Sequence, residues 1–275
     1  MCDSDWSSDV CSSDLALKNA DVGVAMGVRG TDVAKHASDI VLLDDNYATI
    51  ERAIERGRAI FDNVWKFVAY LLSANVAEVA IVFLASLFGY LVLPAVQLLW
   101  INLLTDGLPA LALGADPQGG DVMERPPRDP DRGIVDGRML ALVAGAGTVS
   151  TAVMLGLMFY TLDGAAAITP YAMTMVFTGF VALEFEKLYV IRWFRRTPTF
   201  SNPWLALAVA GSLIFQLAIL YTPLNQHFGT VRLELIDWVH VGTALAVALP
   251  GYLAVVAAID RYLPLVSADG ESGER

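Results

Sequence analysis

Residues 100–109 read Trp-Ile-Asn-Leu-Leu-Thr-Asp-Gly-Leu-Pro, and they decide the fold because they carry polar groups inside an apolar run. On a helix, spacings of three and four residues put Asn102, Thr105 and Asp106 on one face. A carboxylate within a bilayer segment is costly, so these groups should face a partner rather than lipid. The glycine and proline that follow weaken helical hydrogen bonding. The stretch therefore predicts a discontinuous membrane helix, an element from which cation sites are built.

A second polar pair, one apolar run earlier, can supply that partner. Asn75 and Glu78 lie three residues apart within residues 64–93, so they too share a helical face. Alone, such a pair could simply hydrogen-bond two helices together, a contact worth about 0.6 kcal/mol on average. Combined with positions 102, 105 and 106, it predicts an intramembrane cluster of oxygen atoms. Amides, a hydroxyl and carboxylates suit Ca²⁺, and Mn²⁺ accepts the same ligands, whereas copper and zinc would need Cys or His nearby.

The composition is that of a membrane protein. Of the 275 residues, 56% are hydrophobic and 17% are charged, and the mean hydropathy is +0.54, whereas average soluble domains carry about 25% charge. We expect a mainly α-helical, polytopic membrane protein with six transmembrane helices, at residues 64–90, 95–113, 139–162, 171–193, 204–222 and 239–259. Two connections and both termini are assigned to the cytosol because of their basic residues, which are Arg125, Arg128, Arg132, Arg138, Arg192, Arg195, Arg196 and Arg261.

Residues 16–46 are the soluble-looking portion of the chain. A run of apolar and β-branched residues at 22–26 and another at 40–43 predict buried strands, and residues 31–37 predict a helix capped by Thr31. Strand, helix and strand in this order indicate parallel α/β structure. Because fewer than about 50 residues seldom sustain a core, we expect a remnant of a larger domain.

A helical pattern begins at Tyr47 and continues without a strong breaker into the first apolar run. About 38 helical residues span roughly 57 Å, whereas a bilayer core needs about 20 of them. Residues 47–63 are therefore expected to form a cytosolic stalk helix. The transmembrane domain is expected at 64–263, and a cytosolic tail at 264–275.

The first fifteen residues have the wrong character for a signal peptide, since they lack both a basic region and an apolar run. Residues 5–15 resemble a translated sequencing adapter, so residues 1–15 are set aside as an artefact. Without them the chain has no cysteine, and 25 acidic residues stand against 18 basic ones, a net charge of −7 rather than −11. Disulfides are therefore not expected, and neither is a nucleic-acid partner.

Four stretches carry a resemblance to a known family. Residues 16–27 (Ala-Leu-Lys-Asn-Ala-Asp-Val-Gly-Val-Ala-Met-Gly) and 37–46 (Ala-Ser-Asp-Ile-Val-Leu-Leu-Asp-Asp-Asn) resemble the end of the phosphorylation domain of P-type cation-transporting ATPases. Residues 97–110, which include the opening stretch, are similar to the sixth transmembrane helix of the type II, sarco/endoplasmic-reticulum-like calcium pumps. Residues 123–128 (Met-Glu-Arg-Pro-Pro-Arg) match the loop that follows that helix. The resemblance covers residues 16 to about 263.

This resemblance implies that the six spans are the family's fifth to tenth transmembrane helices. Glu184 aligns with the acidic ligand of the eighth helix, although it could instead pair with Lys187, three residues further on. In family terms, Asn102 favours calcium over the sodium–potassium pumps, and Glu78 favours two ion sites over one. Mn²⁺ and Na⁺ are the alternative cargoes. The implied metal ligands are Asn75, Glu78, Asn102, Thr105, Asp106 and Glu184.

The same resemblance implies parts that this sequence lacks. A Gly-Asp-Gly-Val-Asn-Asp-Ala-Pro segment should precede residue 16, and the adapter-like string stands there instead. The phosphorylated aspartate, the nucleotide and actuator domains and the first four helices are also absent. ATP and Mg²⁺ would therefore act only in the intact parent, with which this portion would pair in the bilayer. Two alternatives stay open: an inactive truncated fragment, and a stand-alone cation-binding membrane protein.

Overall fold

A computed structural model describes residues 15–117, 122–124, 127 and 133–263. The expected artefact at 1–14, the tail at 264–275 and the basic residues Arg125, Arg128 and Arg132 lie outside these described residues. The chain divides into two compact units, residues 1–58 and 59–275.

The first unit contains the strand, helix and strand that the sequence predicts. They are β1 (Val24–Met26), α2 (Asp32–Ala37) and β2 (Ile40–Leu42), and the strands pair in parallel with Val24 opposite Ile40. The Thr31 hydroxyl caps α2 by accepting the Ala34 N–H at 3.2 Å. Beside this small sheet lies an apolar groove of about 610 Å³, lined by residues of β2 and of the following helix. The prediction that both strands are buried is wrong for β2, where Ile40 and Val41 are exposed, and of the residues in the two strands only Ala25 and Leu42 are buried.

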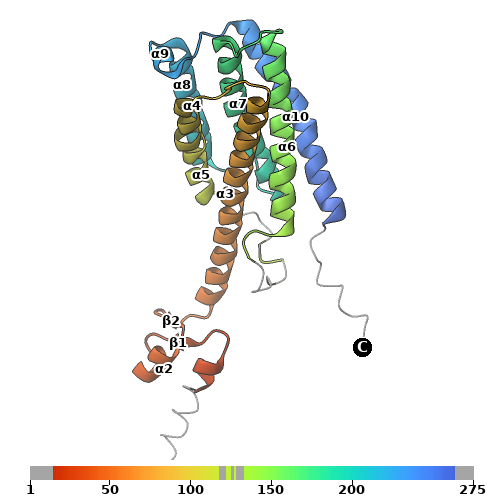
Figure 1. Cartoon of the computed structure of the whole chain (residues 1–275). Coiled ribbons are helices and arrows are strands. Elements are labelled where there is room, and N and C mark those ends of the chain that lie inside the picture. Colours follow the sequence, from red (N-terminus) through yellow and green to blue (C-terminus); the bar gives the residue numbers. More distant parts are fainter. Residues whose placement is uncertain (1–14, 118–121, 125–126, 128–132, 264–275) are drawn as a thin grey trace, which may run out of the picture. The chain divides into compact units, whose positions relative to one another are not determined.

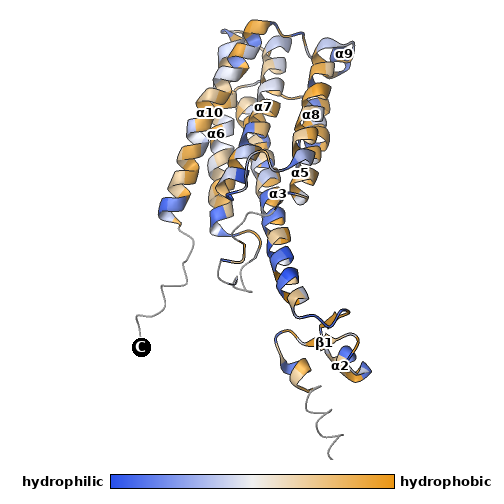
Figure 2. Cartoon of the chain, turned by 180° about the vertical axis from the view of Figure 1, so that it is seen from behind, coloured by the Kyte–Doolittle hydropathy of each residue, from blue (hydrophilic) through white to orange (hydrophobic). Residues whose placement is uncertain are grey.

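Helix α3 (Ala48–Leu87) is a single helix of 40 residues, which corresponds to about 60 Å. It continues from the predicted stalk into the first predicted span without a break, and Figure 2 shows its hydrophilic residues giving way to hydrophobic ones along its length. The helix ends three residues before the predicted boundary at 90. Gly89 then takes a positive φ of 84°, which glycine adopts without steric cost.

The second predicted span is helical but irregular at its centre. It consists of α4 (Ala95–Trp100), a π-helical turn η1 (Ile101–Thr105) and α5 (Gly107–Gly114). The Asp106 N–H donates to the Ile101 carbonyl, five residues back, at 2.9 Å. We expected the helix to weaken after the polar cluster, but the irregular turn contains the cluster. Pro109 is tolerated because it lies in the first turn of the resumed helix, where N–H groups need no intrahelical partner.

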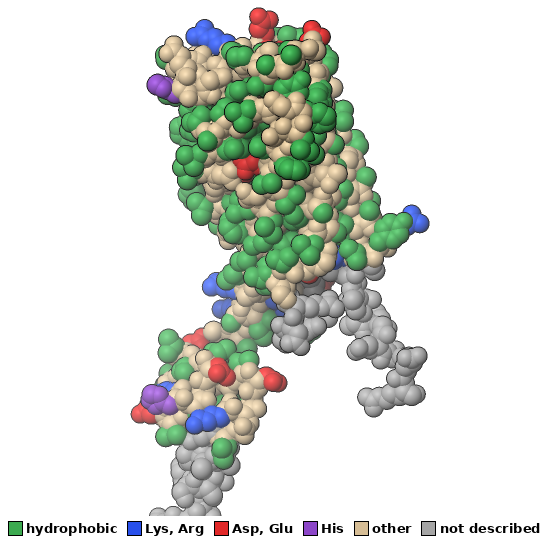
Figure 3. Space-filling view, viewed as in Figure 1, with side chains coloured by type: hydrophobic (Ala, Val, Ile, Leu, Met, Phe, Trp, Pro, Cys, Tyr) green, Lys and Arg blue, Asp and Glu red, His purple; other side chains and the backbone are tan. Residues whose placement is uncertain are grey.

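Five further helices complete the second unit: α6 (Gly137–Leu162), α7 (Pro170–Phe194), α8 (Pro203–Tyr221), α9 (Asn225–Phe228) and α10 (Leu235–Tyr262). Helices α6, α7 and α10 pack against one another, and α5 packs against α8 (Figure 1). Hydrophobic side chains are spread over the visible face of this bundle, and charged ones lie towards its ends apart from an acidic side chain near the middle (Figure 3). Gly147 allows a close approach of α6 to α3, because a Cβ there would lie 2.9 Å from Val76 Cγ1.

Five of the six predicted spans meet the length and hydropathy expected of a membrane helix: Ala48–Leu87, Ala95–Gly114, Gly137–Leu162, Pro203–Tyr221 and Leu235–Tyr262. The sixth, predicted at 171–193, corresponds to α7, a helix of 25 residues that is not among these five candidates. Glu184, Glu186, Lys187 and Arg192 interrupt its apolar character. Even so, 16 of its 25 residues are buried. The described part of the chain is therefore a mainly helical protein with five candidate spans and a charged helix packed among them.

Candidate cation site

A direct contact joins α3 to the π-helical turn. The Asn102 amide Nδ2 donates to both carboxylate oxygens of Glu78, at 2.9 Å and 2.7 Å, and to the Leu98 carbonyl at 3.0 Å. Glu78 is only 8% exposed. The structure thus brings together one predicted ligand from each of the two helices.

The next two predicted ligands lie at the end of the same turn. Asp106 is 1% exposed and Thr105 is fully buried. The Tyr70 hydroxyl of α3 donates to Asp106 Oδ1 at 3.3 Å, and the Thr105 hydroxyl donates to the Ile101 carbonyl at 2.8 Å. That carbonyl also accepts the Asp106 N–H, so it is bonded twice within the turn.

The described hydrogen bond of the Asn75 side chain lies within its own helix. Asn75 is exposed, as Asn102 is, and its Nδ2 donates to the Leu71 carbonyl at 2.8 Å. The structure therefore does not bring Asn75 into contact with the π-helical turn.

Glu184 of α7 forms an ion pair with Lys187. Lys187 Nζ donates to Glu184 Oε1 at 2.7 Å, and both side chains are 0% exposed. The second carboxylate oxygen of Glu184 is buried and has no hydrogen-bond partner among the described residues. Of the two readings that the sequence left open for Glu184, the geometry favours pairing with Lys187 over a free ligand.

The candidate site is a mixed set of oxygens rather than a cluster of acidic or imidazole ligands. Within the described ranges, no three His, Cys, Asp or Glu side chains gather closely enough to hold a metal by themselves. The site's carboxylates are those of Glu78, to which Asn102 donates, and of Asp106, to which Tyr70 donates.

Sequence comparison identifies the family. The family model described as "Cation transporting ATPase, C-terminus" matches residues 90–261, which is more than half of the chain. The chain belongs to the cation-transporting ATPases. It is the C-terminal membrane region of a P-type ATPase and therefore a multi-pass membrane protein.

Relatives come from distant organisms. A calcium-transporting ATPase of Bacillus subtilis (strain 168) is 41% identical over 233 residues, which cover 82% of this chain and 26% of the relative. A probable cation-transporting ATPase F of Mycobacterium tuberculosis is 37% identical over 260 residues, 92% of this chain and 28% of the relative. A calcium-transporting ATPase of Plasmodium falciparum is 37% identical over 271 residues, 81% of this chain and 22% of the relative. The chain thus spans about a quarter of the length of these relatives.

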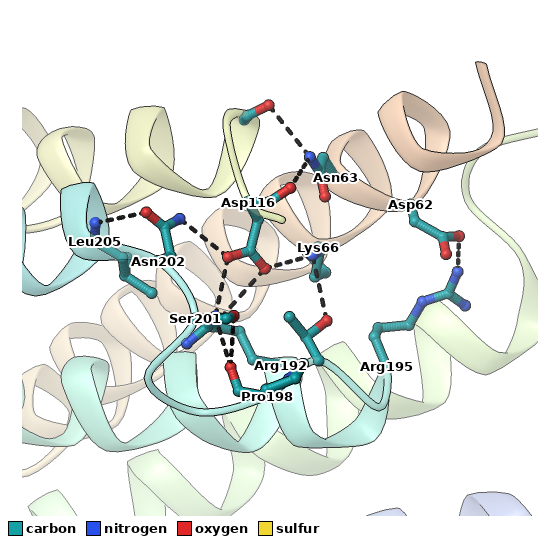
Figure 4. Close-up of polar contacts among 12 residues, drawn as sticks. Asp62, Asn63, Lys66, Asp116, Arg192, Arg195, Pro198, Ser201, Asn202 and Leu205 are labelled. Atoms are coloured by element: carbon teal, nitrogen blue, oxygen red, sulfur yellow. Dashed lines mark hydrogen bonds and ion pairs between the residues drawn. The ribbon is translucent and has the colours of Figure 1, made fainter. Parts of the chain in front are cut away.

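The ATPase region also contains a buried charged cluster that sequence reasoning missed. Asp116, just after α5, accepts hydrogen bonds from Lys66 Nζ at 2.5 Å, Arg192 Nε at 3.2 Å and Asn202 Nδ2 at 3.0 Å (Figure 4). Its backbone carbonyl accepts Asn63 Nδ2 at 2.8 Å. These five residues are called the Asp116 hub below.

Every member of the hub is buried, with Lys66, Asp116 and Arg192 each exposed by 4% or less. Buried charges are rarely tolerated unless they are paired. The signal in the sequence was therefore the presence of Lys66 and Arg192 inside apolar runs. Their partner could not be named from sequence, because Asp116 lies 50 residues from Lys66 and 76 from Arg192.

Proposed function

We propose that this chain is the cation-binding and stalk portion of an ATP-driven Ca²⁺ transporter of the type II P-type class. The observation that carries the proposal is the contact between Glu78 of α3 and Asn102 of the π turn, beside the buried carboxylate of Asp106. In the intact transporter, ATP and Mg²⁺ would act in domains that precede this portion. The chain would lie in a cell membrane with its basic connections in the cytosol.

Calcium is the proposed cargo because of the ligand chemistry. Ca²⁺ takes six to eight oxygen ligands at about 2.3–2.6 Å in flexible geometry. Glu78, Asn102 and Asp106 provide carboxylate and amide oxygens. Two of the relatives named above are themselves described as calcium-transporting ATPases.

Helix α3 supplies the route for coupling. It carries Tyr70 and Glu78 at the site, and the same helix begins at Ala48 in the first unit. A change in the phosphorylation domain of the intact protein that displaced α3 would move Glu78 relative to Asp106. Such a displacement would alter the ligand geometry and so change the affinity for the cation.

The test is ⁴⁵Ca²⁺ uptake by a full-length transporter that contains this sequence and carries Asp106→Asn. We expect uptake to fall by at least tenfold, because the substitution removes a buried charged ligand. Asp163→Asn is the matched control, since Asp163 is exposed at the end of α6 in a left-handed conformation that Asn also adopts. Undiminished uptake by Asp106→Asn would refute the ligand assignment.

Mn²⁺ is a second candidate cargo. The relative from Mycobacterium tuberculosis is described only as a cation-transporting ATPase, and Mn²⁺ accepts the same hard oxygen ligands. Competition decides between the two ions. If Ca²⁺ is the cargo, Mn²⁺ at equal concentration should reduce ⁴⁵Ca²⁺ uptake by less than half, whereas near-complete inhibition would favour manganese.

A further inference from the structure

We propose that Asp116 is a positioning residue, which fixes the register between α3 and residues 101–116 and thereby sets the geometry of the oxygen cluster. This inference rests on the proposed function, because the cluster is the proposed cation site. Asp116 itself lies ten residues beyond Asp106, or about 15 Å along a helix, so it acts through the segment rather than by touching the cation.

Three side-chain contacts between α3 and residues 101–116 follow one antiparallel register. Glu78 contacts Asn102, Tyr70 contacts Asp106, and Lys66 contacts Asp116. As α3 is followed backwards from 78 to 66, its partners advance from 102 to 116. The two segments are therefore joined at three levels, and the hub is the level farthest from the π turn.

The hub is the one of the three contacts in which donor and acceptor both carry a charge. The Asp116 carboxylate is fully buried and bonds two cations, Lys66 at 2.5 Å and Arg192 at 3.0 Å. At the other two contacts a carboxylate accepts from a neutral donor, the Tyr70 hydroxyl at 3.3 Å or the Asn102 amide. Removing one partner from a buried ion pair is strongly destabilising, so the hub is the most costly of the three contacts to break.

The hub also fixes the far end of the segment to two other elements. Arg192 of α7 donates to the carbonyls of Pro198 and Thr199 in the loop before α8. Asn202, the N-cap of α8, donates to both Asp116 and the Ala112 carbonyl of α5. The end of α5 is thus held by α3, α7 and α8 together (Figure 4).

The two ends of the segment differ in backbone structure and in the contacts that hold them. Residues 101–105 form a π turn, a feature frequent at functional sites and irregular by nature. Residues 112–116 are held by buried ionic contacts. A shift of α3 at Lys66 would therefore be passed to Asp116, and the intervening helix would carry it to the π turn.

The test uses Lys66→Met in a full-length transporter that contains this sequence. The substitution removes the ionic contact with α3 and leaves Asp116 paired with Arg192 and Asn202, so no carboxylate is left without a partner. We expect the dissociation constant for ⁴⁵Ca²⁺ to rise at least fivefold with the number of bound ions unchanged. Lys66→Arg keeps the charge and should restore most of the affinity. Arg138→Gln is the control, because it breaks an ion pair between α6 and α10 away from the site.

A double-mutant cycle with Glu78→Gln separates positioning from mere stability. Each substitution raises the dissociation constant for Ca²⁺ by some factor, and independent effects would multiply. If the hub holds Glu78 and Asp106 in register, the double variant should show a rise at least threefold smaller than the product of the two separate factors. Effects that multiply to within about a factor of two are those of independent sites and would overturn the proposal. Should Lys66→Met fail to fold, Asn63→Ala takes its place in the same cycle, with the same two outcomes.

The two proposals fail in different ways. Loss of the proposed function would appear as unchanged ⁴⁵Ca²⁺ binding in Asp106→Asn. Loss of the positioning role alone would appear as normal binding in Lys66→Met beside lost binding in Asp106→Asn.

Discussion

Replacing Lys187 with methionine should strongly destabilise the membrane bundle. The change removes the ammonium that pairs with Glu184 and leaves a carboxylate at the centre of α7 with no cation beside it. Both side chains are 0% exposed, and their ion pair measures 2.7 Å. Water cannot replace the lost partner at such a position.

The expected size follows from this burial. Breaking a buried pair by removing one partner costs about 3–5 kcal/mol, whereas replacing both charges with neutral groups is often close to neutral. One Glu184 oxygen already lacks a hydrogen-bond partner among the described residues, so little compensation is at hand. We therefore expect a loss of about 3–5 kcal/mol for Lys187→Met. Adding Glu184→Gln should recover most of that loss.

The assay is thermal unfolding of the full-length transporter in detergent, together with equilibrium ⁴⁵Ca²⁺ binding. Lys35→Met is the matched control. Lys35 pairs with Asp32 at the same spacing of three residues, but Asp32 is exposed, Lys35 is half-buried and the distance is 3.7 Å. Exposed pairs of this kind contribute about 0–1 kcal/mol, so the control should barely change the unfolding temperature.

The opposite result would refute the pairing. If Glu184 is a free cation ligand, Lys187→Met should leave the unfolding temperature unchanged. Under that reading, the double substitution would lose Ca²⁺ binding instead of regaining stability.

Three further predictions concern packing, pH and ligand assignment. Gly147→Val should destabilise the bundle by about 1–3 kcal/mol through overpacking against α3. Gly156→Val on the same helix, where the added carbon has no neighbour within 4 Å, should have a smaller effect in thermal unfolding. Equal effects of the two substitutions would contradict the contact. Two backbone N–H groups donate to the Asp45 carboxylate at 2.9 Å and 2.8 Å and hold its pKa below its ordinary value. These two amides should therefore be protected from hydrogen exchange above about pH 4 and lose protection as the pH falls further. Protection factors that are unchanged at pH 3 would disprove this. Asn75→Ala should change Ca²⁺ affinity less than twofold in equilibrium binding, while Glu78→Gln changes it more than tenfold. An effect of Asn75→Ala as large as that of Glu78→Gln would show that Asn75 is a ligand.

Local sequence signals predicted most of the fold. Apolar runs located the helices because membrane spans need long apolar segments, and β-branched residues located β1 and β2. The uninterrupted α3 followed from the absence of a breaker after Tyr47. The π turn at 101–105 was not predicted, because Gly107 and Pro109 indicated that the helix would weaken after the polar residues.

The site was predictable only where polar residues break an apolar run. Such residues must face a partner in the bilayer, which is why Glu78 and Asn102 could be named before their contact was known. The rotation of each helix decides which polar residues reach a neighbouring helix, so the sequence could not show that the Asn75 amide bonds within its own helix. The Asp116 hub joins residues from four elements, so its pairing depends on tertiary structure that sequence periodicity does not contain.

The central claim is that a divalent cation binds between α3 and the π turn, and imaging the ion there is the most direct test. A structure of the full-length transporter determined with bound Ca²⁺ should show density about 2.3–2.6 Å from carboxylate oxygens of both Glu78 and Asp106. Ion density elsewhere in the membrane region, with the Glu78–Asn102 contact intact, would contradict the account.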